Sequence, residues 1–301
     1  MASIKQLLKD IPMTNRIVDI SPLHSNWKNK YKLSMDNGSN EILELYNSSE
    51  YDSVMNKIFW VQYLEKKDFP TNHIINHGWC HKKENYYLRL SYIEGECLEN
   101  LLSEADERAQ IDYGRFAGKM LRKIHCLHSP LPNTITVDER IRGMFLFYEK
   151  ETEICKAYPA SEMCEQFLRK HLHWFDNNKE QTLLHGDFHA GNLVLKGDQI
   201  YAIDWSYGKR GNPTEDFVRN IVNATMSDVF AKSLVLSYFD AIVPEAFWQE
   251  LVVFTSLHAI ELVSLHNRYP QVFTDSFVSE QHRLIIDQYN GFNSIIPKYV
   301  N

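Results

Sequence analysis

The stretch LLHGDFHAGNLVLKGDQIYAIDWSYG, residues 183–208, alternates polar side chains with short apolar runs. The runs at 193–195 and 200–203 have the length and the β-branched or aromatic content of strands. The Lys-Gly-Asp-Gln sequence between them suits a turn. We therefore expect a β-hairpin whose open end gathers polar residues.

Folding this hairpin symmetrically about Asp198 places Asn192 opposite Asp204, with about 5 Å between their Cα atoms. An amide oxygen and a carboxylate at one point suit Mg²⁺, which keeps several of its waters. Asp187 precedes Asn192 by five residues, in a loop that contains glycines. We expect its carboxylate to overhang the same point.

This set of groups fits the transfer of a γ-phosphoryl group to a hydroxyl. Asp187 would orient the hydroxyl and accept its proton, while Asn192 and Asp204 would hold the Mg²⁺ that bridges the nucleotide phosphates. The order of the residues matches the pattern D-x-x-x-x-N followed by a metal-binding Asp at a strand end.

The same residues resemble the motifs of the aminoglycoside phosphotransferase and choline kinase family, which consists of small-molecule kinases with a protein-kinase-like fold. Its H-G-D-x-x-x-x-N motif falls on residues 185–192, and its I-D-[WFL] motif falls on residues 203–205. AGKMLRKIH, YIEGECL and GNPTEDFVRNI are similar to further segments of the family. The resemblance implies an α+β, two-lobed fold, with a β-rich N-lobe over 1–93 and a mainly helical C-lobe over 94–301.

The hydrophobic pattern agrees with this division. NKYKLSM and NEILELYN, residues 29–35 and 40–47, predict two strands joined by DNGS, whose residues tolerate positive φ. EYDSVMNKIFWVQYLEKK predicts a helix. Its expected apolar side consists of Met55, Ile58, Phe59, Tyr63 and Leu64. Beyond residue 95, apolar residues three and four apart predict helices at 113–128, 162–175, 215–239 and 245–266.

In the resembling family, a strand lysine contacts the α- and β-phosphates and a helix glutamate holds it. This chain has Glu44 and Lys57 at those positions, so we expect the ion pair to be reversed. Lys57 would reach the nucleotide and Glu44 would orient it, because a carboxylate facing the phosphates would repel them. An alignment shifted by one or two residues would instead leave both charges facing solvent.

The resemblance implies further site residues. The adenine would lie against the connection between the lobes, with two apolar side chains beneath it. The residues expected there are Ser91, Tyr92, Ile93, Val194 and Ile203. His185 would anchor the catalytic loop, and Asp216 would brace that loop or cap the following helix.

The segment expected to cover the phosphates lacks glycine. It has His24, Ser25 and Asn26 where the family often has a glycine-containing turn. Lysines at 28, 30 and 32 alternate along it, and we interpret them as a solvated strand face, with phosphate contact as the alternative.

The composition limits the classes of function that this protein can have. The 301 residues carry a formal net charge of −7, which argues against nucleic-acid or acidic-membrane partners and permits a cationic acceptor without demonstrating one. Five scattered cysteines and a polar start predict a reduced, cytoplasmic protein. Neither G-x-x-x-x-G-K-[ST] nor G-x-G-x-x-G occurs, which excludes Walker and Rossmann sites at the level of motifs.

The sequence does not distinguish among an aminoglycoside-like antibiotic, an amino alcohol and a sugar as the acceptor. It does not distinguish between ATP and GTP as the donor. Glu215, Asp240 and Glu261 could hold a cationic acceptor, although acidic residues on helices are usually solvated. One rival hypothesis is a kinase-like nucleotide-binding protein with weak or no catalysis. A second is a metallohydrolase with His185, Asp187 and His189 as ligands.

Overall fold

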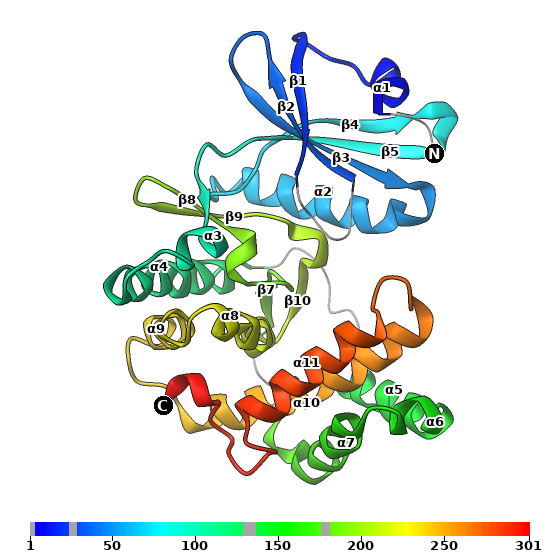
Figure 1. Ribbon diagram of the computed structural model, residues 1–301. Helices are drawn as coiled ribbons and strands as arrows, with labels where there is room; N and C mark the ends of the chain where they lie inside the picture. The colour runs from blue at the N-terminus through cyan, green and yellow to red at the C-terminus, as the bar shows by residue number, and fades with distance from the viewer. Residues whose placement is uncertain (1–3, 24–28, 129–136, 176–180) are drawn as a thin grey trace. The chain divides into compact units, whose positions relative to one another are not determined.

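The computed structural model describes residues 4–23, 29–128, 137–175 and 181–301. The chain divides into two compact units, Met1–Cys97 with Gly191–Gly208, and Leu98–Ala190 with Lys209–Asn301 (Figure 1). The segment 183–208 is therefore divided, because its hairpin belongs to the first unit and the loop that contains Asp187 to the second. The predicted boundary between residues 93 and 94 lies close to the first of these divisions.

The first unit is built on a five-stranded antiparallel sheet in the order β1-β2-β3-β5-β4. Its strands are β1 (Ile17–Pro22), β2 (Asn29–Met35), β3 (Asn40–Asn47), β4 (Ile74–Cys80) and β5 (Asn85–Ser91). The bounds of β2 and β3 are those predicted from the sequence. Gly38 in the turn between them has φ 84°, a left-handed conformation that glycine adopts without strain.

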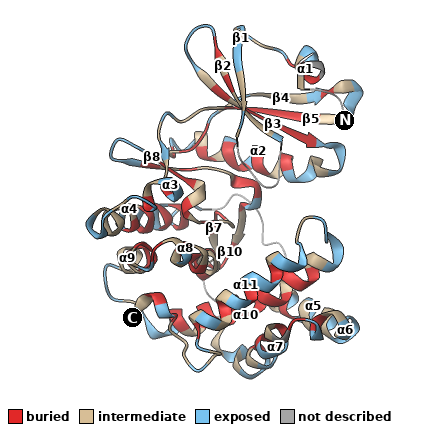
Figure 2. Ribbon diagram, viewed as in Figure 1, coloured by how far each residue is buried: buried red, intermediate tan, exposed pale blue. Residues whose placement is uncertain are grey.

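The two faces of this sheet bury different clusters. Buried residues are found along its strands and along the helix that follows β3 (Figure 2). Leu43 and Leu45 pack with β2 residues and with α1 (Ile4–Leu7) on one face. Tyr46 packs with Val54 and Ile58 of α2 (Tyr51–Glu65) on the other. Because side chains alternate along a strand, Glu44 lies on the face of β3 that is turned toward α2.

The predicted apolar side of α2 was partly wrong. Its buried residues are Val54, Lys57, Ile58, Trp60, Val61 and Leu64. Phe59, expected to be buried, is 38% exposed, whereas Trp60 is fully buried. The helix packs against the sheet on one side and against residues 205–208 on another, so a single apolar stripe does not describe it.

The hairpin predicted within residues 183–208 consists of β8 (Leu193–Lys196) and β9 (Gln199–Ala202), and β6 (Glu96–Cys97) pairs with β8. Leu193 pairs with Ala202, one residue away from the predicted register. The reason is a two-residue turn of Gly197 and Asp198, with Gly197 at φ 58°. Asn192 consequently lies opposite Ile203, whose N–H donates to the Asn192 carbonyl at 2.9 Å, and the prediction that Asn192 faces Asp204 was wrong by one residue.

The second unit is mainly helical. Its longer helices are α4 (Glu107–His125), α5 (Val137–Lys150), α7 (Pro159–His171), α9 (Asp228–Tyr238), α10 (Glu245–Arg268) and α11 (Asp275–Gln288). Its shorter elements are α3 (Leu98–Leu102), α6 (Thr152–Lys156), α8 (Asn220–Met226), a 3₁₀ helix (Pro213–Arg219), and the paired strands β7 (Thr182–Leu184) and β10 (Lys209–Gly211). The segment predicted as helical at 215–239 is interrupted at Ser227, whose side chain caps α9 by accepting the Phe230 N–H.

Helix α10 is the core of this unit. It is long and apolar enough to cross a membrane by length and composition, but 78% of its most apolar window is buried inside the protein. Glu250 within it is 2% exposed and accepts hydrogen bonds from Asn212 and Thr214. A buried helix whose carboxylate is satisfied internally is what a globular core requires.

Candidate active site

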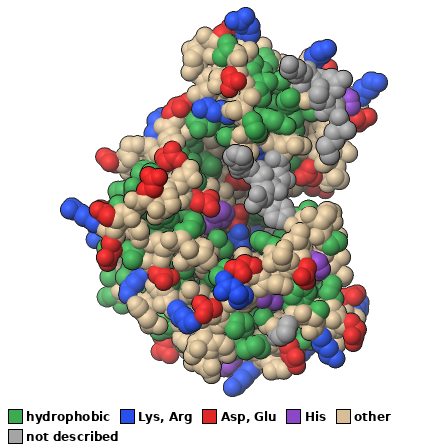
Figure 3. Space-filling model, viewed as in Figure 1, with side chains coloured by type: hydrophobic (Ala, Val, Ile, Leu, Met, Phe, Trp, Pro, Cys, Tyr) green, Lys and Arg blue, Asp and Glu red, His purple; other side chains and the backbone are tan. Residues whose placement is uncertain are grey.

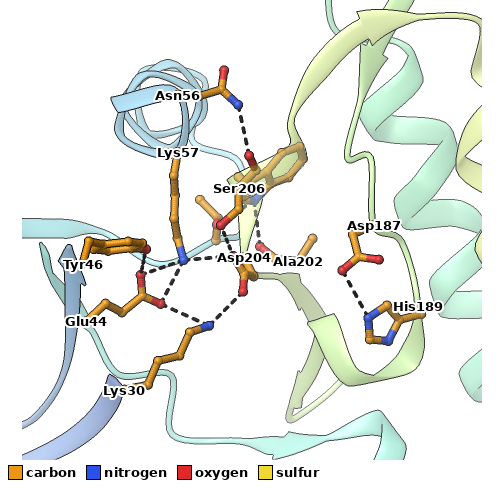
Figure 4. A network of polar contacts seen from close by, with 12 residues as sticks. Lys30, Glu44, Tyr46, Asn56, Lys57, Asp187, His189, Ala202, Asp204 and Ser206 are labelled. Carbon is orange, nitrogen blue, oxygen red and sulfur yellow. Dashed lines mark hydrogen bonds and ion pairs between the residues drawn. The ribbon is translucent and has the colours of Figure 1, made fainter. Parts of the chain in front are cut away.

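Asp204 lies just past β9, where the hairpin opens. Its backbone is left-handed, with φ 61° and ψ 65°, so the chain turns out of the ladder at this residue. Its side chain is 23% exposed and accepts hydrogen bonds from Lys57 at 3.0 Å, Lys30 at 2.8 Å and the Ser206 hydroxyl at 2.6 Å (Figure 4). The carboxylate can bind a metal cation, and the two ammonium groups beside it can donate hydrogen bonds to an anion.

Glu44 and Lys57 form the predicted reversed ion pair. The Lys57 Nζ lies 2.9 Å from both carboxylate oxygens of Glu44, and each side chain is nearly fully buried. The Tyr46 hydroxyl donates a further hydrogen bond to Glu44. The alternative in which both charges face solvent does not hold for this structure.

Lys30 was missed as a member of this group. Its side chain is 17% exposed, and its Nζ lies 3.2 Å from Glu44 in addition to the contact with Asp204. It lies opposite Glu44 in the β2–β3 ladder, and pairing the two predicted strands through their turn would have indicated this position. Lys28 lies outside the described residues, as do His24, Ser25 and Asn26.

The residues predicted to contact the base lie in the first unit. Tyr92 N–H donates to the Asn40 carbonyl at 3.3 Å, and the Lys32 ammonium lies 4.3 Å from the centre of the Tyr92 ring. Ser91 hydrogen-bonds to His73 and Asn72, and the Ile93 carbonyl accepts the Gly95 N–H. Val194 is buried in β8, and Ile203 is half-buried at the end of the hairpin. Their contact with a nucleotide stays a prediction.

Asp187 lies in the second unit, in the loop after β7. Its carboxylate is 23% exposed and contacts the Arg219 guanidinium at 2.9 Å and His189 Nε2 at 3.4 Å (Figure 4). Burial raises the pKa of Asp187, but the His189 hydrogen bond and the Arg219 charge outweigh this effect and hold the pKa well below its usual range. The carboxylate is therefore ionised at neutral pH.

Asp216 and His185 lie beneath this loop. The buried Asp216 carboxylate accepts the backbone N–H of His185 at 2.8 Å and that of Gly186 at 2.7 Å. His125 Nε2 lies 3.1 Å from it. His185 is fully buried, and its Nδ1 accepts the Asp187 N–H at 3.3 Å. Both residues thus contact the backbone that carries Asp187.

The acidic residues considered for a cationic acceptor already have cationic partners. Arg140 bridges Glu215 at 2.5 Å and Glu261 at 2.9 Å, and Lys209 lies 2.6 Å from Glu215. Asp240 is paired with Arg122. In Figure 3 charged side chains of both signs are interspersed over the visible face of the protein. A cationic acceptor at Glu215 or Glu261 would have to compete with these side chains.

The metallohydrolase hypothesis required His185, Asp187 and His189 to surround one ion. Over the parts of the chain that the structure describes, no group of three or more His, Cys, Asp or Glu side chains is placed to hold a metal. Asp187 contacts His189 and Arg219, whereas the backbone of the buried His185 is bound to Asp216.

Comparison with known proteins identifies the class. Residues 19–242 match the Phosphotransferase enzyme family. Because this match covers well over half of the chain, the protein belongs to that family and is a phosphotransferase. No functionally curated protein matches it in sequence.

Three solved structures share the fold. A mutant of aminoglycoside 2′-phosphotransferase-IIIa in complex with GDP has a TM-score of 0.70 at 13% identity, over 92% of this chain and 94% of that chain. A thermostable mutant of aminoglycoside phosphotransferase APH(4)-Ia, in a ternary complex with ADP and hygromycin B, has a TM-score of 0.66 at 14% identity, over 90% and 94%. A choline/ethanolamine kinase family protein from Mesorhizobium loti has a TM-score of 0.63 at 13% identity, over 92% and 91%. The predicted two-lobed, protein-kinase-like fold is confirmed.

Proposed function

We propose that this phosphotransferase moves the γ-phosphate of ATP or GTP to a hydroxyl group of a small molecule, with Mg²⁺ as cofactor. The observation that carries the proposal is the environment of Asp204. Its carboxylate is partly exposed where the hairpin opens, and two lysine ammonium groups lie within 3.0 Å of it. A metal-binding carboxylate flanked by cations suits the phosphates of a nucleotide.

The residues at this site have the oxygen ligands that Mg²⁺ prefers. Asn192 and Asp204 offer an amide oxygen and a carboxylate, which are hard ligands that this ion accepts. Asp204 leaves the ladder at φ 61°, and its carboxylate is 23% exposed, so a metal ion could reach it. A Mg²⁺ ion held there would neutralise negative charge on the phosphates during transfer.

Asp187 would act on the acceptor. Its carboxylate would accept a hydrogen bond from the attacking hydroxyl and take up the proton as the bond to phosphorus forms. A low pKa makes it a weak base, which suits a loose transition state in which positioning contributes more than proton abstraction. Arg219 and His189 would hold this carboxylate in one orientation.

The acceptor class that we propose is a hydroxyl-bearing small molecule, among aminoglycoside-like compounds, amino alcohols and sugars. The fold relatives include a complex with hygromycin B and a protein of the choline/ethanolamine kinase family. We place the reaction in the cytoplasm and expect neither nucleic acid nor membrane as a partner, in keeping with the net charge of −7.

The test is turnover of a panel of such hydroxyl compounds with ATP and with GTP, followed by mass spectrometry of phosphorylated products. Wild type should form a product, and Asp187→Asn should lose turnover while it still binds nucleotide. Asp198→Asn, in the exposed hairpin turn, is the matched control and should keep activity. Nucleotide binding by wild type without turnover of any compound would favour the non-catalytic, kinase-like alternative.

A further inference from the structure

We infer that Lys30 on β2, rather than Lys57 on α2, is the lysine that contacts the nucleotide phosphates. This inference rests on the proposed function and assigns one residue of the same site. The sequence pattern predicted this role for Lys57 on the helix. The inference assigns it instead to β2, the neighbour of the strand that carries Glu44.

The register of the sheet puts Lys30 at this site. Lys30 pairs with Glu44 across the β2–β3 ladder, and side chains of directly opposed residues lie on the same face. That face is turned toward α2, since Tyr46 of β3 packs there. The Lys30 Nζ reaches Asp204 at 2.8 Å and Glu44 at 3.2 Å (Figure 4). The ammonium group therefore lies against the proposed metal-binding carboxylate.

Lys57 has its hydrogen-bonding capacity committed to carboxylates. An ammonium group has three N–H donors. Its Nζ lies 2.9 Å from each oxygen of Glu44 and 3.0 Å from Asp204, and its side chain is 2% exposed. A phosphate could bind Lys57 only by displacing a carboxylate oxygen from a buried cation, and breaking such a pair is costly.

Lys30 has the capacity that Lys57 lacks. Its contacts with described residues are one oxygen of Asp204 and one of Glu44, which leaves a third N–H for a phosphate oxygen. Its side chain is 17% exposed, compared with 2% for Lys57. Lys30 is thus the more accessible of the two ammonium groups beside Asp204.

The charges of the group give Lys30 a second effect. Lys30 and Lys57 balance Glu44 and Asp204, so the four side chains together are neutral. Without Lys30 the same group carries one net negative charge and would repel the phosphates. In this arrangement Glu44 and Lys57 form a buried brace that positions Lys30 and Asp204, and the Tyr46 hydroxyl satisfies Glu44 further.

A chemical test uses the wild-type protein. An acyl phosphate of ATP or GTP brings an activated carbonyl to the lysine that contacts the phosphates. The unprotonated ε-amine attacks this carbonyl, the bond from the carbonyl carbon to the phosphate oxygen breaks, the nucleotide leaves, and a proton passes to solvent. Peptide mass spectrometry should find Lys30 acylated, and excess unmodified nucleotide should suppress the label. Nucleotide-protected label on Lys57 would overturn the inference.

A binding test separates contact from structural support. Lys30→Met keeps the aliphatic stem and should weaken binding of the nucleoside triphosphate by about 10- to 100-fold, which is the effect of one hydrogen bond to a charged group. Binding of the matching nucleoside, which has no phosphate, should not change. Lys66→Met, an exposed lysine at the end of α2, is the control and should bind both ligands as wild type does.

The outcomes distinguish the two proposals. Wild type that binds neither ATP nor GTP would overturn the proposed function and this inference together. Wild type that binds a triphosphate as tightly as Lys30→Met would overturn only the role of Lys30. Equal losses for nucleoside and triphosphate in Lys30→Met would show that Lys30 supports the fold instead of the phosphates. If Lys30→Met does not fold, the acylation of wild type decides.

Discussion

The indole N–H of Trp60 donates a hydrogen bond to the backbone carbonyl of Gly208 at 2.6 Å. One turn earlier on α2, the Asn56 amide donates to the carbonyls of Ser206 and Gly208. Helix α2 therefore holds the backbone of the segment that begins at Asp204. A Cβ atom at position 208 would lie 2.5 Å from the Trp60 ring, so this contact depends on glycine.

Gly208→Ala should destabilise the protein by about 1–3 kcal/mol, the usual cost of overpacking a buried contact. Urea unfolding followed by circular dichroism measures the change. Gly143→Ala is the matched control, because a Cβ there meets nothing within 4 Å on helix α5. The control should gain about 0.5–1 kcal/mol from the lower flexibility of alanine. Equal losses in both variants would contradict the role assigned to the Trp60 contact.

The buried Lys57 should contribute strongly to stability. Lys57→Met removes the cation that Glu44 contacts through both oxygens, so that the buried carboxylate keeps the Lys30 ammonium at 3.2 Å and loses the closer of its two cations. Loss of one partner of a buried ion pair costs about 3–5 kcal/mol. Thermal unfolding should show this loss with or without nucleotide.

A double-mutant cycle checks that the loss comes from the broken Lys57–Glu44 ion pair. Adding Glu44→Gln to Lys57→Met removes the buried carboxylate that has lost this cation, so the double variant should be more stable than Lys57→Met alone. Lys66→Met should unfold with wild type. Additive losses from the two substitutions would mean that Glu44 and Lys57 are not energetically coupled.

Local sequence signals predicted part of this fold well. The β2–β3 hairpin had the expected bounds because three turn-forming residues, Asp36 to Gly38, stand between two runs of strand-like residues. The segment 185–192 identified the family because its spacing is specific. The reversed Glu44–Lys57 pair could be inferred because the strand and the helix that carry it were both recognised.

Other features depended on geometry that a single sequence leaves open. The register of β8 and β9 is set by the two-residue turn at Gly197, and folding about Asp198 shifted it by one residue. The burial of Trp60 follows from packing against residues 205–208, which no periodicity within α2 indicates. Lys30 was interpreted as a solvated lysine because its partner Asp204 lies far from it in the sequence.

Asp216→Asn should destabilise the second unit by about 2–3 kcal/mol, the loss of hydrogen bonds to a buried charge. An amide at this position offers one oxygen where the carboxylate accepts from His185, Gly186 and His125. Asp240→Asn, with a side chain that is 75% exposed, is the control and should change stability little. Chemical denaturation at pH 7 measures both.

The loss in Asp216→Asn should also depend on pH. Burial raises the pKa of Asp216, but the hydrogen bond and charge of His125 lower it below its ordinary value. A depressed pKa in the native state contributes stability above the unfolded-state pKa of about 3.9, and this contribution is lost as the pH falls through the native value. The difference between wild type and variant should stay constant down to about pH 5 and narrow below about pH 3.9. A difference that widens in acid would refute this assignment.

His258 on α10 should make the protein sensitive to acid. Burial lowers the pKa of His258 to about 3, and the charges of Arg219 and Arg140 add to the effect. The unfolded-state pKa of histidine is about 6.5. At pH values between this and the native pKa, the unfolded chain binds a proton that the native state does not. The free energy of unfolding therefore decreases by about 1.4 kcal/mol for each unit by which the pH is lowered. His258→Gln removes this proton site. Between pH 7 and pH 5, wild type should lose about 2 kcal/mol more than His258→Gln in urea unfolding, while the exposed-site variant His128→Gln should follow wild type. Parallel pH profiles for wild type and His258→Gln would show that the pKa of His258 is the same in the native and the unfolded state, which contradicts this prediction.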